Sequence, residues 1–316
     1  MERNSTIDIV KCFAVFIVVC LHAVTYSSNW QESGYVSFII SVFPRWVIPF
    51  FFIVSGYFFG IKMVNKNNAK VYFNNYLFKL IRLFFSWYLF YLVYDLLVRV
   101  VLSAYMGLDV KAGLINYVKT YLKLNVLYYG EGMTSYHLWF LTALIWSIVI
   151  IYVFIKLKRL SLLLMISFIL NVIGLFGQTY SGIFDLSIQT KDAMFFGLFY
   201  TTIGCYLAFH YDWFMQKVNV VKSSALIFLF ILFSFIQVVE RSITVTLLDG
   251  IRPIGEYYLS TIPLTISLFL VTIKNTAIGK STIISKVGKN AVGIYVSHLF
   301  VISALVLFLN FVGLWK

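Results

Sequence analysis

Long apolar segments are the feature that most restricts how this chain folds. About nine of them occur, at approximately residues 6–28, 36–61, 77–101, 137–155, 160–177, 193–210, 223–239, 258–273 and 291–313. A helix of about 20 apolar residues crosses the hydrocarbon core of a bilayer. The segments are continuously apolar and lack the period-two alternation of barrel strands. The sequence therefore predicts an all-α fold, a polytopic transmembrane helical bundle of about nine to ten spans.

The composition excludes most soluble proteins. Charged residues make up 12% of the 316 residues and hydrophobic residues 61%, whereas a typical globular domain has about 25% charged residues. A soluble fold of this size needs more polar residues to cover its surface. Since no repeat, low-complexity tract or change of composition divides the chain, we expect a single domain over residues 1–316. Cys12, Cys20 and Cys205 lie inside apolar segments without metal-ligand spacing, so neither a metal site nor a structural disulfide is expected.

The distribution of basic residues predicts the orientation in the membrane. The chain has 25 Lys and Arg against 12 Asp and Glu, and basic connections at 62–82, 156–159, 217–222 and 274–289 alternate with less basic ones. The positive-inside rule then places the N-terminus in the cytoplasm of a multi-pass cell-membrane protein, with the C-terminus outside if there are nine spans. No basic stretch with interleaved aromatic residues forms a soluble module, so the bilayer is the expected partner and nucleic acid is not.

The connection at 103–136 leaves the number of spans open. It is long, aromatic and amphipathic, with three tyrosines and several leucines between 117 and 128. Such a segment either lies on the outer surface of the membrane or contributes a further embedded segment.

Three ionisable residues in the first span are candidates for chemistry, because each costs about 2.5–3.5 kcal/mol to insert unless it is satisfied. Eleven residues turn a helix through about 1100°, which is only about 20° more than three full turns. Lys11 and His22 therefore lie on one face of the helix, about 16 Å apart. Asp8 precedes Lys11 by three residues on the same side and can pair with it. In the structural alternative, Asp8 and Lys11 anchor the helix at the interface and His22 is a hydrogen-bonded core residue. The alignment of all three favours a functional role.

The second span adds a buried arginine and a helix-breaking pattern. Arg45 lies about 13 Å below the outer surface and His22 about 9 Å, so the two are expected to be neighbours. Pro49 and Gly56 permit a kinked helix where it lines a protein cavity. The Ser55–Gly56 pair fits equally well a small-residue packing face.

Charged residues of the third span have two interpretations. Lys79 and Arg82 lie near the cytoplasmic end and suit phosphate groups, or they extend toward anionic lipid. Asp95 and Arg99 have the spacing of a self-satisfied pair near the outer end.

Two later motifs complete the candidate set. In His137-Leu138-Trp139, the histidine is expected to face the outer compartment, and Trp139 is either an interfacial belt residue or part of a site. In the last span, Tyr295 and His298 share one face, and His298 is expected near mid-membrane. A lone histidine of this kind is more often a structural hydrogen-bond partner.

These motifs together resemble the acyltransferase-3 family of membrane proteins. The resemblance is carried by Arg3, Asp8, Lys11 and His22, by the Arg-x3-Pro-x-Phe-Phe and Ser-Gly-Tyr run at 45–57, by Lys79 and Arg82, by His-Leu-Trp-Phe-Leu at 137–141, and by Tyr295 and His298. Lys11-x10-His22 is similar to the family's Arg/Lys-x10-His signature. The match extends from the first span to the last, and the order and spacing of the motifs make it specific.

The resemblance implies an integral membrane O-acyltransferase. Such proteins transfer an acyl group, usually acetyl, from cytoplasmic acyl-CoA to a carbohydrate or related acceptor at the cell envelope. Acyl-CoA is then a co-substrate, most often acetyl-CoA, and no cofactor is permanently bound. His22 corresponds to the family's essential histidine and is expected to be the general base. The residues expected to bind substrate are Lys11, Arg45, Ser55, Tyr57, Lys79, Arg82, His137, Trp139, Tyr295 and His298.

Two departures from the family pattern and two rival functions remain open at the level of sequence. Family members typically have ten spans, and several carry an extracytoplasmic SGNH hydrolase-like domain, whereas here a stand-alone transmembrane domain is expected. One rival is a transporter or flippase for an envelope precursor or small molecule. The other is an unrelated membrane-bound O-acyltransferase with His298 as its base, but that family's paired Asn–His pattern is not evident.

Overall fold

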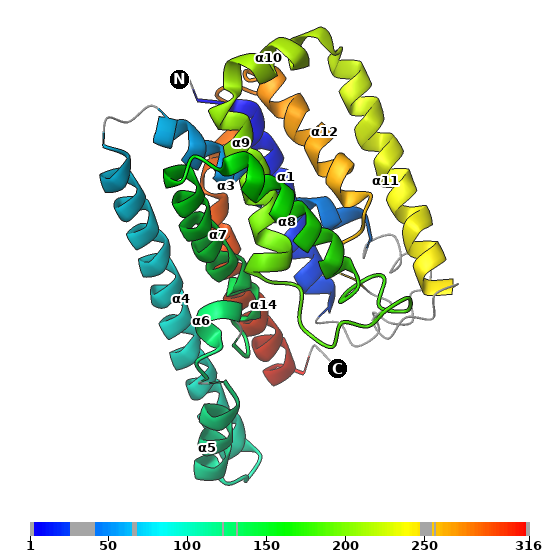
Figure 1. Ribbon diagram of the computed structural model, residues 1–316. Coiled ribbons are helices and arrows are strands. Elements are labelled where there is room, and N and C mark those ends of the chain that lie inside the picture. Colours follow the sequence, from blue (N-terminus) through cyan, green and yellow to red (C-terminus); the bar gives the residue numbers. More distant parts are fainter. Residues whose placement is uncertain are drawn as a thin grey trace.

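The computed structural model describes residues 3–25, 42–64, 68–121, 123–130, 132–246, 255 and 257–313. Within these ranges the chain forms helices and no strand. The helices pack side by side into a bundle (Figure 1). The prediction of an all-α transmembrane bundle is therefore confirmed.

The principal helices coincide with the apolar segments of the sequence. They are α1 (Ser5–Thr25), α3 (Val47–Val64) with the 3-10 turn η2 (Phe43–Trp46) before it, α4 (Ala69–Tyr105), α7 (Trp139–Lys156) after the 3-10 turn η3 (Tyr136–Leu138), α8 (Leu160–Leu175), α9 (Leu198–Phe209) after the π-helix η4 (Ala193–Gly197), α11 (Ser223–Thr246), α12 (Thr261–Lys274) and α14 (Ala291–Phe311). The shorter helices are α5 (Val110–Tyr121), α6 (Val126–Tyr129), α10 (Tyr211–Val220) and α13 (Ile283–Lys289). Parts of two predicted segments, 26–28 and 36–41, lie outside the described residues.

Length and apolar composition identify the helices that can cross a membrane. Six described helices qualify, or seven if the pair Ala193–Phe209 and Tyr211–Val220, bent by 94°, forms one span. The helices α8 and α12 are apolar but shorter. The described helices coincide with the predicted segments, and the number of spans, about nine to ten, stays a prediction.

The connection at 103–136 contains no further spanning helix in its described part. The helix α5 has 12 residues and is therefore only about 18 Å long. It lies beside the C-terminal part of α4 at one end of the bundle (Figure 1). Of the two alternatives for this connection, the described residues support a segment at the end of the bundle.

The two ends of the bundle differ in their connections. The N-terminus and α10 lie at one end, and α5, the start of α7 and the end of α14 lie at the other (Figure 1). The basic connections after α3, α7, α9 and α12 belong to the first end. Which end faces the cytoplasm stays a prediction of the positive-inside rule.

Glycines bring α3 and α9 into backbone contact. A Cβ atom on Gly56 would stand 1.9 Å from the carbonyl oxygen of Thr201, and one on Gly204 would stand 1.9 Å from that of Ile53. Small residues let membrane helices approach closely and gain van der Waals contact. The packing interpretation of Gly56 is therefore confirmed, and the half-buried Ser55 lies beside this contact.

Alanine at Gly56 or Gly204 is expected to destabilise the protein by about 1–3 kcal/mol, the usual cost of overpacking. The matched control is Gly293→Ala in α14, because no described atom beyond its own helix lies within 4 Å of the new Cβ position. Thermal unfolding in detergent should show a lower Tm for Gly56→Ala and Gly204→Ala than for Gly293→Ala. Equal Tm values for all three variants would contradict the backbone contact.

Candidate functional site

Three histidines from distant parts of the sequence converge at one place. The ring centroids of His22 and His298 are 5.1 Å apart, and those of His137 and His298 are 5.0 Å apart. His22 lies in the last turn of α1, His137 in η3 and His298 in α14. The side chains of His137 and His298 are buried, with residue exposures of 3% and 4%, and His22 is half-buried. This histidine cluster (His22, His137 and His298) joins the candidate residues of the first, fourth and last predicted spans.

Contacts to the α14 backbone hold the cluster together. Tyr295 donates a hydrogen bond to the carbonyl oxygen of His137, and His137 Nε2 lies 3.3 Å from the carbonyl oxygen of Val296. Tyr91 of α4 donates to the same Val296 carbonyl at 2.8 Å. The start of α7 and the first half of α14 are thereby fixed to each other and to α4. Tyr295 thus positions the cluster, and its ring lies 5.9 Å from that of His298.

The hydrogen bonds assign the tautomers of the two buried histidines in their neutral form. A backbone carbonyl oxygen only accepts, so the ring nitrogen beside it carries the proton. His298 Nδ1 lies 2.6 Å from Tyr295 O, which leaves a lone pair on Nε2. His137 donates through Nε2 to Val296 O, which leaves a lone pair on Nδ1. Among the described residues, His298 Nε2 and His137 Nδ1 are buried without a hydrogen-bond partner, and they are thus acceptors for a hydroxyl group.

Tyr136 is a site residue that the sequence did not reveal. Its hydroxyl lies 2.9 Å from His22 Nδ1, and the two rings meet edge to face with centroids 5.4 Å apart. No spacing rule connects residues 114 positions apart in different helices. The only signal was its place directly before the His-Leu-Trp motif.

The structure corrects two expectations for that motif. His137 is 3% exposed and points into the protein, so it does not face an outer compartment as expected. Trp139 is 7% exposed and packs against Phe52 and Phe196, with ring centroids 6.2 and 5.8 Å away. Lys191 Nζ lies 4.9 Å from the centre of its ring. A belt residue faces lipid, so the belt interpretation of Trp139 is wrong.

The residues of the second span have different surroundings. The η2 turn that carries Arg45 contacts both α1 and α3, and Arg45 is half-buried. Its predicted proximity to His22 stays a prediction. Tyr57 is 4% exposed and packs edge to face on Phe269 of α12, with ring centroids 5.3 Å apart. Tyr57 thus contributes to packing between α3 and α12.

The ion pair predicted in the first span is present. Lys11 Nζ and Arg3 Nε each lie 2.7 Å from a different oxygen of Asp8. Arg3 also donates to the carbonyl oxygen of Ser285 in α13 at 3.0 Å. A Cβ on Gly288 would stand 1.6 Å from the Asp8 carbonyl oxygen, so α13 packs closely on this turn of α1. The resulting cluster carries two cations for one carboxylate.

Lys79 and Arg82 are exposed on α4. The guanidinium carbon of Arg82 lies 4.9 Å from the centre of the Phe78 ring. No described interaction joins either residue to Lys11. Their shared role in a basic entrance stays a prediction, and their exposure also fits the lipid-facing alternative.

Asp95 and Arg99 do not form the predicted pair in the described structure. Asp95 instead accepts hydrogen bonds from Tyr117 Oη at 3.0 Å and from the Thr134 backbone N–H at 3.2 Å. Arg99 lies over the ring of Tyr117, 5.4 Å from its centroid. The helical spacing was correct, but α5 and the segment before η3 supply Asp95 with other hydrogen-bond donors.

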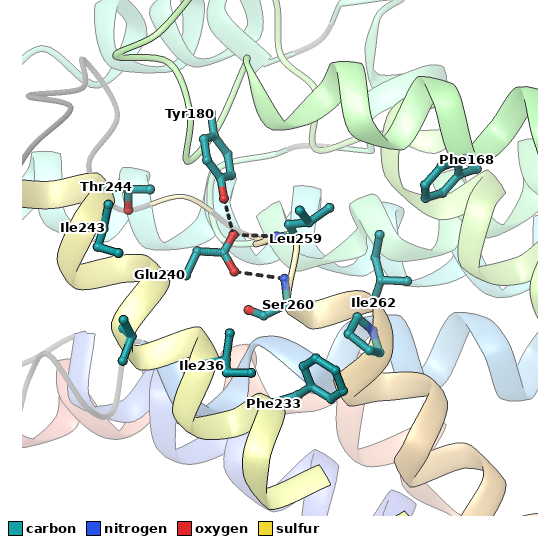
Figure 2. Close-up of a pocket in the computed structure, with 12 residues that line it drawn as sticks. Phe168, Tyr180, Phe233, Ile236, Glu240, Ile243, Thr244, Leu259, Ser260 and Ile262 are labelled. Carbon is teal, nitrogen blue, oxygen red and sulfur yellow. Dashed lines mark hydrogen bonds between the residues drawn. The ribbon is translucent and has the colours of Figure 1, made fainter. Parts of the chain in front are cut away.

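A pocket that none of the three histidines lines lies between α8, α11 and α12. Its volume is about 550 Å³, and its lining is mostly apolar, including Phe168, Phe233 and Ile262. Figure 2 shows Glu240 among the lining residues, where Tyr180 Oη and the Leu259 and Ser260 backbone N–H groups donate to the carboxylate at 2.7–2.9 Å. Burial and the contact with Glu240 raise the pKa of Tyr180, so that this hydroxyl remains a donor. Glu240 therefore ties together three segments and is committed to structure.

The histidine cluster does not meet the geometry of a metal site. In the part of the chain that the structure describes, no group of three or more His, Cys, Asp or Glu side chains is placed to hold a metal ion. The three cysteines are free. What the cluster offers is imidazole nitrogens that can accept or transfer protons, next to a tyrosine hydroxyl.

Comparison with known proteins gives one match over nearly the whole chain. A family described as an acyltransferase domain matches residues 4–315. Two proteins of Enterococcus faecalis, each named amino-acid racemase, are 28% identical over 221 residues and 25% identical over 223 residues. These matches cover 66% and 65% of this chain but 28% and 29% of the racemases, so the chain spans less than a third of their length. No solved structure matches.

Nitrogen-15 NMR of histidine-labelled protein tests the assigned tautomers. The chain has four histidines, so substituting one at a time assigns each signal. At a pH where the rings are neutral, we expect the proton of His298 on Nδ1 and that of His137 on Nε2. His210→Gln, at the α9–α10 bend, is the control and should leave the other signals unchanged. A His298 signal with the proton on Nε2 would refute the assignment.

Proposed function

Because the chain belongs to the acyltransferase-3 family, we propose that it is an integral membrane O-acyltransferase. In this proposal it transfers an acyl group, most often acetyl, from cytoplasmic acyl-CoA to a hydroxyl of a cell-envelope carbohydrate or related acceptor. The observation that carries the proposal is the convergence of His22, His137 and His298, three residues of the family-like motifs, into one partly buried cluster. Hydroxyl acylation needs a base, and this cluster supplies one.

In the proposed reaction, His22 is the general base. If Nδ1 carries the ring proton and donates to Tyr136 Oη, Nε2 is the basic atom. It takes the proton of the acceptor hydroxyl while the hydroxyl oxygen attacks the thioester carbonyl. The carbon–sulfur bond then breaks, the acceptor keeps the new ester, and the proton leaves on the CoA thiol. Such proton transfer typically accelerates a reaction by about 10²–10⁴-fold.

The other residues of the cluster have supporting roles in this proposal. Tyr136 orients the His22 ring and its tautomer, as the partner of a catalytic imidazole does. The lone pairs of His298 Nε2 and His137 Nδ1 accept hydrogen bonds from hydroxyls of the acceptor. Arg45 stabilises the oxyanion that develops on the thioester carbonyl.

In this proposal the acyl-CoA donor enters at the N-terminal end of α1, opposite the end that carries His22. Lys11 and Arg3 together outweigh the charge of Asp8, and Lys286 and Lys289 extend from the neighbouring α13. These cations suit the phosphates of CoA, with Lys79 and Arg82 as further contributors. Lys11 and His22 are about 16 Å apart along the helix, so the thioester reaches His22 if the pantetheine arm runs extended along α1.

A transporter or flippase is the alternative function. It is supported by the ionisable side chains inside the bundle, which also occur in transport pathways. Stabilisation of purified protein by acyl-CoA discriminates the two, because a ligand that binds only the folded state raises its Tm. Racemisation is not proposed, because the matched segment is less than a third of the racemases.

Replacing His22 by alanine is expected to reduce acetyl transfer by at least about 10²-fold, because the general base is lost. The assay is transfer of labelled acetyl from acetyl-CoA to envelope material in membranes that contain the variant. Protein amount and Tm should equal those of His210→Ala, a histidine remote from the cluster. Retained transfer in His22→Ala would refute the assignment of the base.

Replacing Lys11 by glutamine is expected to raise the KM for acetyl-CoA about tenfold, the effect of losing one charge-assisted hydrogen bond. Lys11→Arg keeps the charge and the pairing with Asp8, so its KM for acetyl-CoA should stay close to that of the unchanged protein. Lys217→Gln on α10 is the control, as an exposed lysine at the same end of the bundle. An unchanged KM in Lys11→Gln, with a normal Tm, would contradict a donor site at this end of α1.

A further inference from the structure

A small pocket is linked to the histidine cluster through Tyr136. Its volume is about 250 Å³, and it is formed by the end of α5, by α6 and by the segment that leads into η3. Drug-sized ligands occupy pockets of about 300–1,000 Å³, so this pocket has room for one ring-sized group. Its polar lining consists of Thr120, Tyr121, Lys123, Asn125, Tyr129 and Tyr136.

Tyr136 connects this pocket to His22. The same residue that lines the pocket places its hydroxyl 2.9 Å from His22 Nδ1. A group seated in the pocket is therefore one side chain away from the imidazole. α5 and α6 lie at the end of the bundle opposite the N-terminus (Figure 1), and Lys11, near the N-terminal end of α1, has the donor role in the proposed function.

The walls of the pocket are fixed by a buried carboxylate. Asp95, 4% exposed in α4, accepts from Tyr117 of α5 and from the backbone of Thr134 before η3. Burial, followed by the charge of Asp95, raises the pKa of Tyr117, so the hydroxyl stays protonated and keeps donating. Tyr117 in turn packs on Tyr121, with ring centroids 5.1 Å apart. One side chain thus positions both α5 and the Tyr136 segment.

The chemistry of the lining indicates the ligand. Tyrosine rings offer flat apolar faces with a hydroxyl at the edge, which suit the faces and hydroxyls of a sugar ring. Thr120 and Asn125 add donors and acceptors. Lys123 is the only charged residue among the described lining residues, and none of them carries a carboxylate.

We infer that this pocket seats the acceptor, and that the acceptor is a single sugar-sized, polyhydroxylated ring that carries a negative charge. The inference rests on the proposed function and deepens it by assigning the acceptor site and its charge. Lys123 pairs with the anionic group, the tyrosines contact the ring, and the ring hydroxyl next to Tyr136 is the one directed toward the histidine cluster. Specificity for the acceptor then comes from α5 and α6, outside the main bundle.

Direct binding of model sugars tests this inference without any transfer step. The full-length protein in lipid nanodiscs is titrated with methyl glucuronide, which is anionic, and with methyl glucoside, its neutral counterpart. We expect the glucuronide to bind about fivefold more tightly, as an exposed ion pair allows. Lys123→Gln should abolish this preference and leave the glucoside affinity unchanged. Lys119→Gln also removes one positive charge, but from a residue of α5 that does not line the pocket. This control variant should still bind the glucuronide more tightly than the glucoside.

Each outcome decides the inference. The inference would be overturned by any of three results: equal effects of Lys123→Gln and Lys119→Gln on the preference for glucuronide, tighter binding of the glucoside, or no binding of either sugar. Tyr129→Ala should weaken the binding of both sugars alike. Unchanged affinity in that variant would show that the tyrosines do not contact the ring. Acetyl-CoA stabilisation is measured on the same samples. If acetyl-CoA has no effect while the glucuronide binds as expected, the acyltransferase proposal fails and the sugar site stands.

Discussion

A polar group without a hydrogen-bond partner is costly in an apolar environment, and this cost governs the arrangement of the protein. Three carboxylates of the helices described above illustrate this cost, because each has hydrogen-bond or ion-pair partners. Asp8 binds two cations, Asp95 a tyrosine and a backbone N–H, and Glu240 three donors. The partners of Asp95 and Glu240 come from other elements, and Arg3 also bonds to α13, so satisfying these charges fixes the position of a helix or loop as well.

The candidate site departs from this pattern. His137 and His298 each use one nitrogen to hold the backbone and leave the other without a described partner, although both side chains are buried. An unsatisfied buried acceptor destabilises the folded protein by about 1–3 kcal/mol. Such a cost is understandable where a substrate hydroxyl supplies the missing hydrogen bond. The same residues that weaken the folded state are then those that receive the acceptor.

The main bundle and the short helices α5 and α6 differ in how they are packed. In the main bundle, α3 and α9 meet at Gly56 and Gly204 so closely that no side chain fits between their backbones there. α5 and α6 are short, lie at the end of the bundle and enclose a pocket between them. In the proposed function, the main bundle holds the base in α1 and the α5–α6 region recognises the acceptor, so acceptor specificity can change without altering the bundle.

The sequence alone determined the helical class, the positions of the membrane helices and the Asp8–Lys11 pair. These depend on composition and on local spacing, since apolar length and helical periodicity act within one segment. It also indicated His22, His137 and His298 as separate candidates. Only the tertiary structure decided that the three rings meet, that Tyr136 binds His22, and that Asp95 bonds Tyr117 and not Arg99. Such contacts join residues up to 276 positions apart, as between His22 and His298, and the lowest-energy partner of a buried polar group depends on which helices pack together, which no local pattern specifies.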